Sequence, residues 1–291
     1  MRRNKILGEL VTFKNTQGLH LDGILYQKDT HKITIIHIHG SLGNFYQNQF
    51  LRLMAKMYQD NGINFLSFNL SAHDGLAEGF RNDEFEYIGG TIVDFNECIN
   101  DIEGALEFVK PFSERIILQG HSLGCDRTLH FLLNHSDKYD FILLSPCDSY
   151  QLQVKRVAPE TVQEQIKRLK KEGNLDVFQL LPPNEYGVSQ NDEVYDIPIT
   201  KKALLSIMEG PPYKLIRLGV QKKYFIDSKC LIYLGGQDPL QTAHRNDMFH
   251  YFKERVKEVT EVYIPEGDHD LSNCEKDVIK NIITWQNSLE L

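Results

Sequence analysis

Short apolar runs rich in β-branched residues recur along most of this chain, and stretches with helical periodicity separate them. The first continuous run, Ile33–Ile38, is typical of a strand that is covered on both faces. Further strand-like runs are Ile63–Leu70, Arg115–Leu118, Phe141–Leu144, Lys229–Leu234 and Val259–Ile264. The helix-like stretches are Gln49–Gln59, Val93–Val109, Leu123–Asn134, Ala243–Val256 and Asp277–Trp285. This alternation predicts an α/β protein with a largely parallel sheet and helices on both of its faces.

Two segments depart from this alternation. Glu9–Phe13 and Leu19–Tyr26 alternate apolar and polar residues around an Asn/Gly-containing turn, which predicts an antiparallel hairpin. The segment 147–228 contains a charged amphipathic helix candidate, Val162–Lys171, but no run typical of a buried strand. Because a loop of that length without structure of its own is uncommon, we predict a helical cap over residues 147–228. The core would then comprise residues 1–146 and 229–291, with the cap placed where open α/β sheets bind ligands.

Composition restricts the partners and the compartment. The formal net charge is −8, so we expect no broad attraction to nucleic acid or to anionic lipid. No stretch approaches the roughly 20 apolar residues that a membrane-spanning helix needs, and the basic N-terminus reaches Glu9 without the apolar core of a signal peptide. The five cysteines include no Cys-x-x-Cys pair, which favours free thiols. We therefore expect a cytoplasmic protein without a membrane or nucleic-acid partner, and the oligomeric state stays open.

A Gly-x-Ser-x-Gly pattern, Gly120-His121-Ser122-Leu123-Gly124, directly follows one strand-like run and opens a helix-like stretch. This strand–turn–helix setting is the one that a nucleophile elbow requires, because the sharp turn lifts the serine hydroxyl clear of the sheet. We expect Ser122 to be a nucleophile, and the Leu123 N–H at the start of the helix to stabilise an oxyanion. The competing interpretation is a glycine-rich turn that carries an ordinary exposed serine.

The run Ile33–Ile38 leads into His39-Gly40-Ser41-Leu42-Gly43, where Gly40 allows the chain to turn sharply. Such a turn can direct the Ser41 N–H toward the same developing charge as Leu123, so Ser41 is the second predicted oxyanion donor. His37 and His39 lie on one face of the strand. They have no convincing third ligand close in sequence, so we expect structural roles and no metal.

A serine hydroxyl needs a base at neutral pH, and histidine is the usual one. His269 follows the last strand-like run and lies in a polar turn before the C-terminal helix. Asp238 follows the run Lys229–Leu234 and is the predicted acid that orients His269.

Several neighbours of these residues compete with them or have simpler explanations. Asp148 also follows a strand-like run and is the alternative acid. Asp268 and Asp270 flank His269, and solvation or helix capping explains them. His121 within the elbow is expected to be structural, and Cys125 to be a small buried residue.

Four of these features together, His39-Gly40, Gly120–Gly124, Asp238-Pro239 and His269, resemble the α/β-hydrolase family from about Leu19 to the C-terminus. The chain order of serine, aspartate and histidine is the family's order. The resemblance implies an eight-stranded, mostly parallel sheet, a cap inserted after the sixth strand, and no cofactor. Asn69–Gly75 falls where many members carry a turn resembling Arg-Gly-His-Gly-x-Ser, but here the serine is missing and Asp74 stands near its place.

The leading functional hypothesis is hydrolysis of a carboxylic ester of a small organic molecule through an acyl-enzyme on Ser122. Amide or thioester cleavage is less favoured, and acyl transfer, an acyl-carrier thioesterase and a non-catalytic binding protein are the alternatives. A basic group in the cap fits a solvated helix face better than a pocket for an anion. Its members are Lys167, Arg168, Lys170 and Lys171. Three cap tyrosines, Tyr186, Tyr195 and Tyr213, are candidates for lining a pocket, although packing explains them as well.

Overall fold

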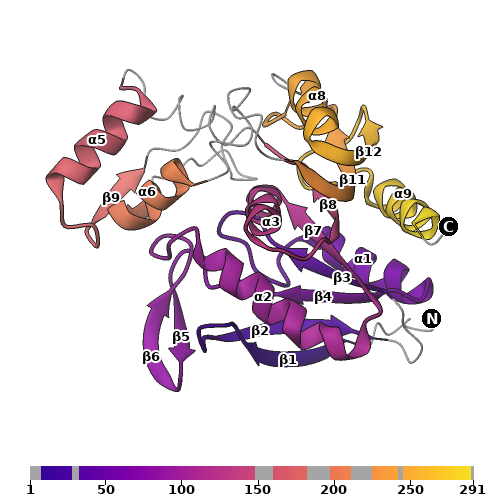
Figure 1. Ribbon diagram of the computed structural model, residues 1–291, viewed down its shortest axis with the longest axis horizontal. Coiled ribbons are helices and arrows are strands. Elements are labelled where there is room, and N and C mark those ends of the chain that lie inside the picture. Colours follow the sequence, from indigo (N-terminus) through magenta and orange to yellow (C-terminus); the bar gives the residue numbers. More distant parts are fainter. Residues whose placement is uncertain are drawn as a thin grey trace.

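One eight-stranded sheet forms the centre of the molecule (Figure 1). The computed structural model describes residues 8–27, 33–147, 160–181, 197–210, 225–241 and 245–289. The strands of this sheet are β1 (Glu9–Lys14), β2 (His20–Tyr26), β3 (Ile33–Ile38), β4 (Asn64–Phe68), β7 (Arg115–His121), β8 (Asp140–Leu144), β11 (Ile226–Gly235) and β12 (Val256–Ile264). Their order is β1-β2-β4-β3-β7-β8-β11-β12. β1, β2 and β4 pair antiparallel, and every other pair is parallel. The predicted mostly parallel sheet and the N-terminal hairpin are confirmed.

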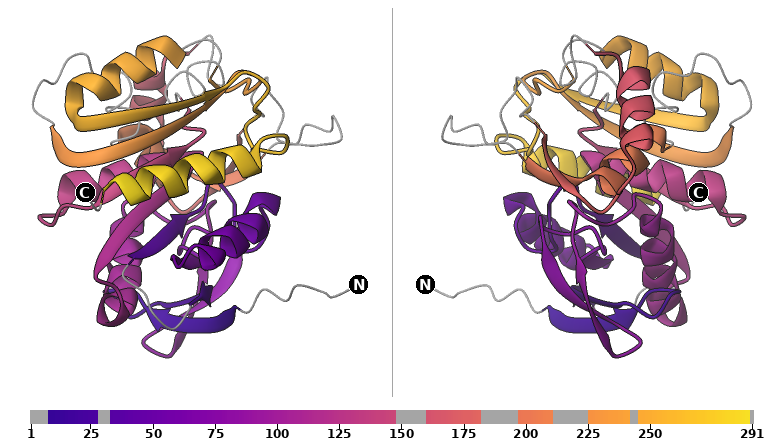
Figure 2. Two further views of the ribbon diagram at one scale, coloured as in Figure 1. Left: turned by 90° about the vertical axis from the view of Figure 1, so that its right-hand side faces the viewer. Right: turned by 90° about the vertical axis from the view of Figure 1, so that its left-hand side faces the viewer.

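Helices cover both faces of this sheet, as predicted. The helices are α1 (Gln49–Asp60), α2 (Glu97–Val109), α3 (Leu123–Asn134), α8 (Arg245–Arg255) and α9 (Glu275–Ser288), with a short 3₁₀ turn at Lys110–Phe112. Alternate residues of β3 point to opposite faces: Ile35 joins the cluster beneath α1 and α9, and Ile36 joins the cluster beneath α2 and α3. Figure 2 shows α1 and α9 side by side. All six residues of β3 are buried, which explains its continuous apolar run.

A second hairpin, β5 (Ala77–Arg81) and β6 (Glu84–Ile88), lies between β4 and α2 and was not predicted. Asn82 and Asp83 form its two-residue turn, both with positive φ, as hairpin turns of this length require. Phe80 and Phe85 pair across the strands and are each 50% exposed. The hairpin therefore presents an aromatic outer face to solvent.

Four elements follow β8, the sixth strand of the main sheet in chain order. They are α5 (Val162–Glu172), β9 (Phe178–Leu181), β10 (Ile197–Thr200) and α6 (Lys201–Glu209). Their buried side chains form a cluster of their own, and Figure 1 shows α5, β9 and α6 together at one end of the molecule. The helix candidate Val162–Lys171 is confirmed as α5, but this segment is not wholly helical, because β9 and β10 pair antiparallel. The boundaries of a separate cap domain at 147 and 228 stay a prediction.

The inserted elements are attached to the core at the loop before α2. Thr200 donates its backbone N–H to the carbonyl oxygen of Thr91 at 2.8 Å, and its side chain accepts the Ala203 N–H that begins α6. The Ser206 hydroxyl accepts the N–H of Phe95 at 2.8 Å. In the described part of the chain, no helix is long and apolar enough to cross a membrane.

Candidate active site

The turn between β7 and α3 holds Ser122 in a strained conformation, with φ 54° and ψ −124°. Neighbouring backbone leaves no room for side chains at either flanking glycine. A Cβ on Gly124 would lie 2.0 Å from the carbonyl oxygen of Ile38, and one on Gly120 would lie 2.4 Å from that of Gly124. The glycines therefore let strand and helix approach closely while the turn stays tight. This is the geometry that the pattern predicted for Ser122.

Three of the predicted site residues meet at the carboxyl ends of β7, β11 and β12. His269 Nε2 lies 3.0 Å from Ser122 Oγ, and His269 Nδ1 lies 2.8 Å from Asp238 Oδ2. Asp238 is fully buried, and its other carboxylate oxygen accepts the N–H of Leu240 at 2.9 Å. Asp238 is thus the carboxylate at His269 Nδ1, whereas the alternative acid, Asp148, lies outside the described residues.

The surroundings of His269 favour its protonated form. Burial alone would lower its pKa, but the hydrogen bond to Asp238 and the nearby carboxylates of Asp238, Asp270 and Asp268 outweigh burial and raise the pKa above 6.5. Asp268 also accepts the N–H of Ser272 at 2.7 Å, so its carboxylate fixes the turn before α9 and does not cap that helix, whose N-cap is Cys274. Asp238 therefore both orients the imidazole and stabilises its positive charge.

The loop after β3 passes directly beside Ser122. A Cβ on Gly40 would lie 3.0 Å from Ser122 Cβ, so only a glycine fits there without displacing a neighbour. The two predicted oxyanion donors, Ser41 and Leu123, follow Gly40 and Ser122 in the chain. Within the described ranges, neither of their backbone N–H groups has a hydrogen-bond acceptor. Their role as oxyanion donors stays a prediction.

A buried arginine that was not predicted from the sequence fixes the main chain of this loop by hydrogen bonds. Arg127 on α3 donates to the carbonyl oxygens of His39 at 3.0 Å and Gly40 at 3.2 Å. His39 Nε2 accepts the Leu70 N–H at 3.1 Å, so its proton is on Nδ1 and is donated to the carbonyl oxygen of Gly40 at 2.9 Å. Burial and the charge of Arg127 hold the pKa of His39 well below 6.5. His39 is a neutral structural residue, as expected.

The other side of the same loop is tied to Asp74, the residue at which the family resemblance breaks. The Asp74 N–H donates to the carbonyl oxygen of Gly43 at 3.0 Å, and Asn44 Nδ2 donates to Asp74 Oδ1 at 3.0 Å. His73 Nδ1 lies 2.7 Å from Asp74 Oδ2. The departure from the family pattern therefore supplies a carboxylate that fixes the loop beside Ser122.

A buried glutamine that was also missed fixes the turn that carries Asp238. Gln241 Oε1 accepts the N–H of Gly235 at 3.0 Å, and its Nε2 donates to the carbonyl oxygen of Pro146 at 3.0 Å. These two bonds join the end of β11 to the end of β8, with Asp238 in the turn between Gly235 and Gln241. A glutamine three residues after Asp238 is a weak sequence signal, because Pro146, the partner that links it to β8, lies 95 positions away in the chain.

The remaining chemical candidates have structural roles. His37 Nδ1 lies 3.0 Å from Gln119 Nε2, and burial lowers the pKa of His37 to about 3, so it is neutral in the core. Cys125 Sγ is buried and lies 3.3 Å from the carbonyl oxygens of Gly120 and Leu144. Among the described residues, no group of three or more His, Cys, Asp or Glu side chains could hold a metal ion.

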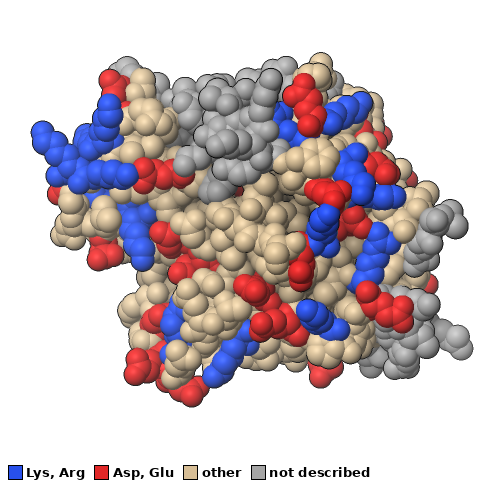
Figure 3. Space-filling view, viewed as in Figure 1, with Lys and Arg blue, Asp and Glu red and all other residues tan. Residues whose placement is uncertain are grey.

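Two of the four basic residues on α5 pair with acids, and Figure 3 shows basic and acidic side chains side by side at this end of the surface. Arg168 donates to Glu160 and Glu172, and Lys170 donates to Glu209 at 2.6 Å. These contacts agree with a solvated helix face rather than an anion pocket. The three tyrosines singled out from the sequence, Tyr186, Tyr195 and Tyr213, lie outside the described residues.

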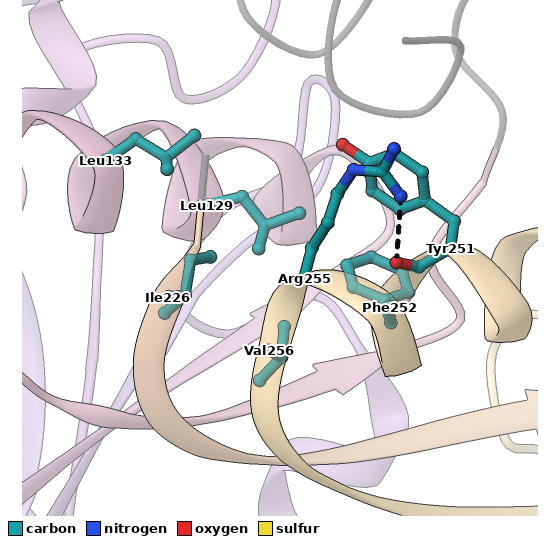
Figure 4. A pocket seen from close by; sticks show the side chains of 7 residues that line it. All are labelled: Leu129, Leu133, Ile226, Tyr251, Phe252, Arg255 and Val256. Atoms are coloured by element: carbon teal, nitrogen blue, oxygen red, sulfur yellow. Dashed lines mark hydrogen bonds between the residues drawn. The ribbon is translucent and has the colours of Figure 1, made fainter. Parts of the chain in front are cut away.

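A small apolar depression between α3, β11 and α8 is separate from this site (Figure 4). It is lined by Leu129, Leu133, Ile226, Tyr251, Phe252, Arg255 and Val256. Ile226 and Val256 begin their strands, whereas Ser122 follows the carboxyl end of β7. The depression therefore lies toward the opposite end of the parallel strands from Ser122.

No family model and no curated protein matches the sequence. Solved structures match along nearly the whole chain. The Pyrococcus furiosus esterase Pf2001 is 15% identical with a TM-score of 0.61, covering 97% of this chain and 93% of that one. Est1E from Butyrivibrio proteoclasticus, with ferulic acid bound, is 14% identical with a TM-score of 0.68, covering 96% and 98%. Mouse alpha/beta hydrolase domain-containing protein 10 is 18% identical with a TM-score of 0.66, covering 97% and 99%. The chain has the α/β-hydrolase fold.

Proposed function

We propose that this protein is a serine hydrolase that cleaves carboxylic esters of small organic molecules through an acyl-enzyme on Ser122. The observation that carries the proposal is the continuous hydrogen-bonded chain from Ser122 Oγ through His269 to the buried Asp238. A hydroxyl paired with a base, which an acid orients in turn, is the arrangement that nucleophilic acyl transfer requires. The esterases Pf2001 and Est1E, which share this fold, support an ester as the substrate.

In the proposed reaction, Ser122 Oγ attacks the acyl carbon while His269 Nε2 takes the hydroxyl proton. Asp238 stabilises the imidazolium that forms and keeps the Nδ1–H tautomer in place. The backbone N–H groups of Ser41 and Leu123 hold the oxyanion of the tetrahedral intermediate. His269 then gives its proton to the leaving alcohol, and a water molecule activated by the same histidine releases the acid.

A fluorophosphonate probe tests the nucleophile without knowledge of the natural substrate. We expect the probe to label the wild type and Ser136→Ala, a matched change at an exposed serine in the α3–β8 loop, but not Ser122→Ala. Hydrolysis of p-nitrophenyl acetate and butyrate should disappear in Ser122→Ala and His269→Ala. Equal labelling of wild type and Ser122→Ala would refute the assignment.

Product analysis with different acyl donors and acceptors separates the alternatives. Ester products that form only when an alcohol is added would identify an acyltransferase, and turnover restricted to carrier-bound acyl groups would identify a thioesterase. A wild type that resists the probe and turns over no acyl substrate would be a binding protein on this scaffold.

We also propose a cytoplasmic location and a small-molecule acyl substrate as the partner. Five free thiols, at Cys98, Cys125, Cys147, Cys230 and Cys274, support this compartment, since an oxidising one would favour disulfides.

A further inference from the structure

His121, the variable residue before the serine in the Gly-x-Ser-x-Gly turn, contacts the main chain of the proposed base. His121 Nε2 lies 2.9 Å from the carbonyl oxygen of His269, and the centroids of the two rings are 5.2 Å apart. Because a carbonyl oxygen only accepts hydrogen bonds, Nε2 carries the proton and donates it. A residue expected to be structural thus touches the base that acts on its neighbour Ser122.

The other edge of the His121 ring is also held. Asn48 Nδ2 lies 3.4 Å from His121 Nδ1, which has a free lone pair in this tautomer and accepts the amide proton. Phe50 packs against the ring in an edge-on arrangement, with centroids 5.0 Å apart. The side chain is buried, so α1 and the loop before it fix its position.

The hydrogen bonds of this turn hold the neighbours of His269 rather than His269 itself: the N–H of Gln237 donates to Gly267, and the N–H groups of Leu271 and Ser272 donate to Asp268. Tyr233 Oη donates to the carbonyl oxygen of Asp268 at 3.1 Å, but among the residues that the structure describes, His269 itself has no other main-chain hydrogen bond. The His269 side chain is 20% exposed and is fixed at Nδ1 by Asp238. Asp238 can orient the imidazole, whereas His121 fixes the backbone from which the imidazole extends.

His121 stays neutral while the base titrates. Burial, with the neighbouring charge of His269, lowers the pKa of His121 to about 4, although the hydrogen bond to the His269 carbonyl and the carboxylates of Asp270 and Asp238 oppose this shift. The pKa of His269, in contrast, lies above 6.5. The Nε2–H donor therefore has the same form in both protonation states of His269 that the proposed reaction uses.

We propose that His121 is a positioning residue of the triad: its Nε2–H holds the His269 main chain so that the imidazole stays between Ser122 and Asp238. The inference rests on the proposed function. Small displacements of reacting groups can lower rates by about 10²-fold. Loss of this one bond is therefore expected to lower kcat by about 10-fold or more, with little change in KM.

Three substitutions separate the hydrogen bond from the packing. His121→Phe keeps a ring against Phe50 but has no donor, and His121→Asn places its amide near the Nδ1 position rather than Nε2. His121→Gln can place an N–H near the Nε2 position, so it should retain most of kcat while the other two lose it. His130→Phe is the matched control, since His130 is another buried histidine with a pKa lowered to about 4 by burial, and its Nε2 bonds to Asn96 away from the triad.

The readouts are kcat and KM with p-nitrophenyl butyrate, the fluorophosphonate labelling rate, and the low-field proton resonance of His269 Nδ1–H. We expect the resonance to broaden and both rates to fall in His121→Phe, and all three to recover in His121→Gln. Thermal melts identify variants that fail to fold; His121→Asn replaces His121→Phe in that event.

Wild-type rates and an unchanged resonance in folded His121→Phe would overturn the inference. A wild type that the probe does not label would instead refute the proposed function, and the resonance would still test whether His121 positions His269. The two failures are therefore distinguishable.

Discussion

At the scale of single residues, His269 is balanced between burial, which lowers its pKa, and carboxylates, which raise it. A general base acts in its neutral form, so kcat/KM should rise with pH as His269 loses its proton. Because the pKa of His269 is raised, this rising limb of the pH profile should lie above pH 6.5. Asp238→Asn removes both the hydrogen bond to a carboxylate and its charge, so this limb should move to lower pH. The analogous change in a well-studied triad lowers kcat by about 10⁴-fold.

The pH profile of kcat/KM for wild type, Asp238→Asn and Asp270→Asn checks this prediction. Asp270 is exposed and contributes only through its charge, so its variant should shift the limb in the same direction by less. A limb that stays in place in Asp238→Asn would show that another carboxylate sets the pKa of His269.

Gly40 gives a second prediction at this scale, because its missing side chain makes room for Ser122. A Cβ there would lie 3.0 Å from Ser122 Cβ, so Gly40→Ala should displace the loop that carries the Ser41 N–H. Loss of one oxyanion donor lowers kcat by about 10²–10³-fold, and we expect a fall approaching that range.

The control for this change is Gly75→Ala, where the nearest atom to a new Cβ is Thr91 Cγ2 at 3.9 Å. Steady-state kinetics of both variants decide the question. Similar kcat values for Gly40→Ala and Gly75→Ala would mean that the loop accommodates the methyl group.

At the scale of elements, α3 both begins directly after Ser122 and holds the loop after β3. Arg127→Met removes the two hydrogen bonds to the carbonyl oxygens of His39 and Gly40 and leaves these groups buried. We expect the free energy of unfolding to fall by about 1–3 kcal/mol, and kcat to fall because the loop loosens. Urea denaturation and kinetics at a temperature well below unfolding measure the two effects separately.

Arg115→Met is the matched control, because Arg115 lies at the other end of β7 and pairs with Asp140 and the carbonyl oxygen of Leu289. It should lower stability without lowering kcat. If Arg127→Met loses stability but keeps kcat, the arginine supports the fold and does not position the loop.

Elements and residues with a local sequence signal could be predicted, and those defined by distant contacts could not. β3 could be predicted because all six of its residues are buried, which gives the sequence a continuous apolar run. The turn at Ser122 could be predicted because its close packing requires glycines on both sides of the serine. The β5–β6 hairpin was missed although Glu84–Ile88 alternates acidic and apolar residues, because its two strands are only five residues long and form a separate, mostly exposed sheet. Arg127 and Gln241 bond to backbone groups more than 80 positions away, so nothing near them in the sequence indicates their roles.

At the scale of the whole molecule, the fold brings the carboxyl ends of β3, β7, β11 and β12 together at one edge of the sheet. The inserted elements attach at Thr91, in the loop that also packs on this edge: a Cβ on Gly90 would lie 2.9 Å from Leu42 in the loop beside Ser122. The candidate site and the attachment of the inserted elements therefore share one scaffold, the loop after β3 and the loop before α2.

Asp101 on α2 connects parts of this scaffold. It is fully buried, and it accepts hydrogen bonds from Asn15 in the β1–β2 turn and from the N–H and hydroxyl of Ser71 after β4. Burial raises the pKa of Asp101 from 3.8 to about 6, although the hydrogen bonds from Ser71 and Asn15 oppose this shift. The carboxyl group is thus a pH-sensitive link between the N-terminal hairpin, the loop after β4 and α2.

The consequence for stability has a definite sign. Between pH 4 and 6 the folded chain holds a proton on Asp101 that the unfolded chain releases, so this group makes the free energy of unfolding fall as pH rises. A shift of this size corresponds to about 3 kcal/mol across that window.

In Asp101→Asn the contribution is absent, so the stability of wild type relative to this variant should decline by about that amount between pH 4 and 7. Urea denaturation of both proteins at several pH values measures the difference and cancels the other titrating groups. Ser71→Ala removes the hydroxyl donor, one of the groups that lower this pKa, and should move the decline to higher pH. A difference independent of pH would mean that Asp101 keeps its charge in the fold.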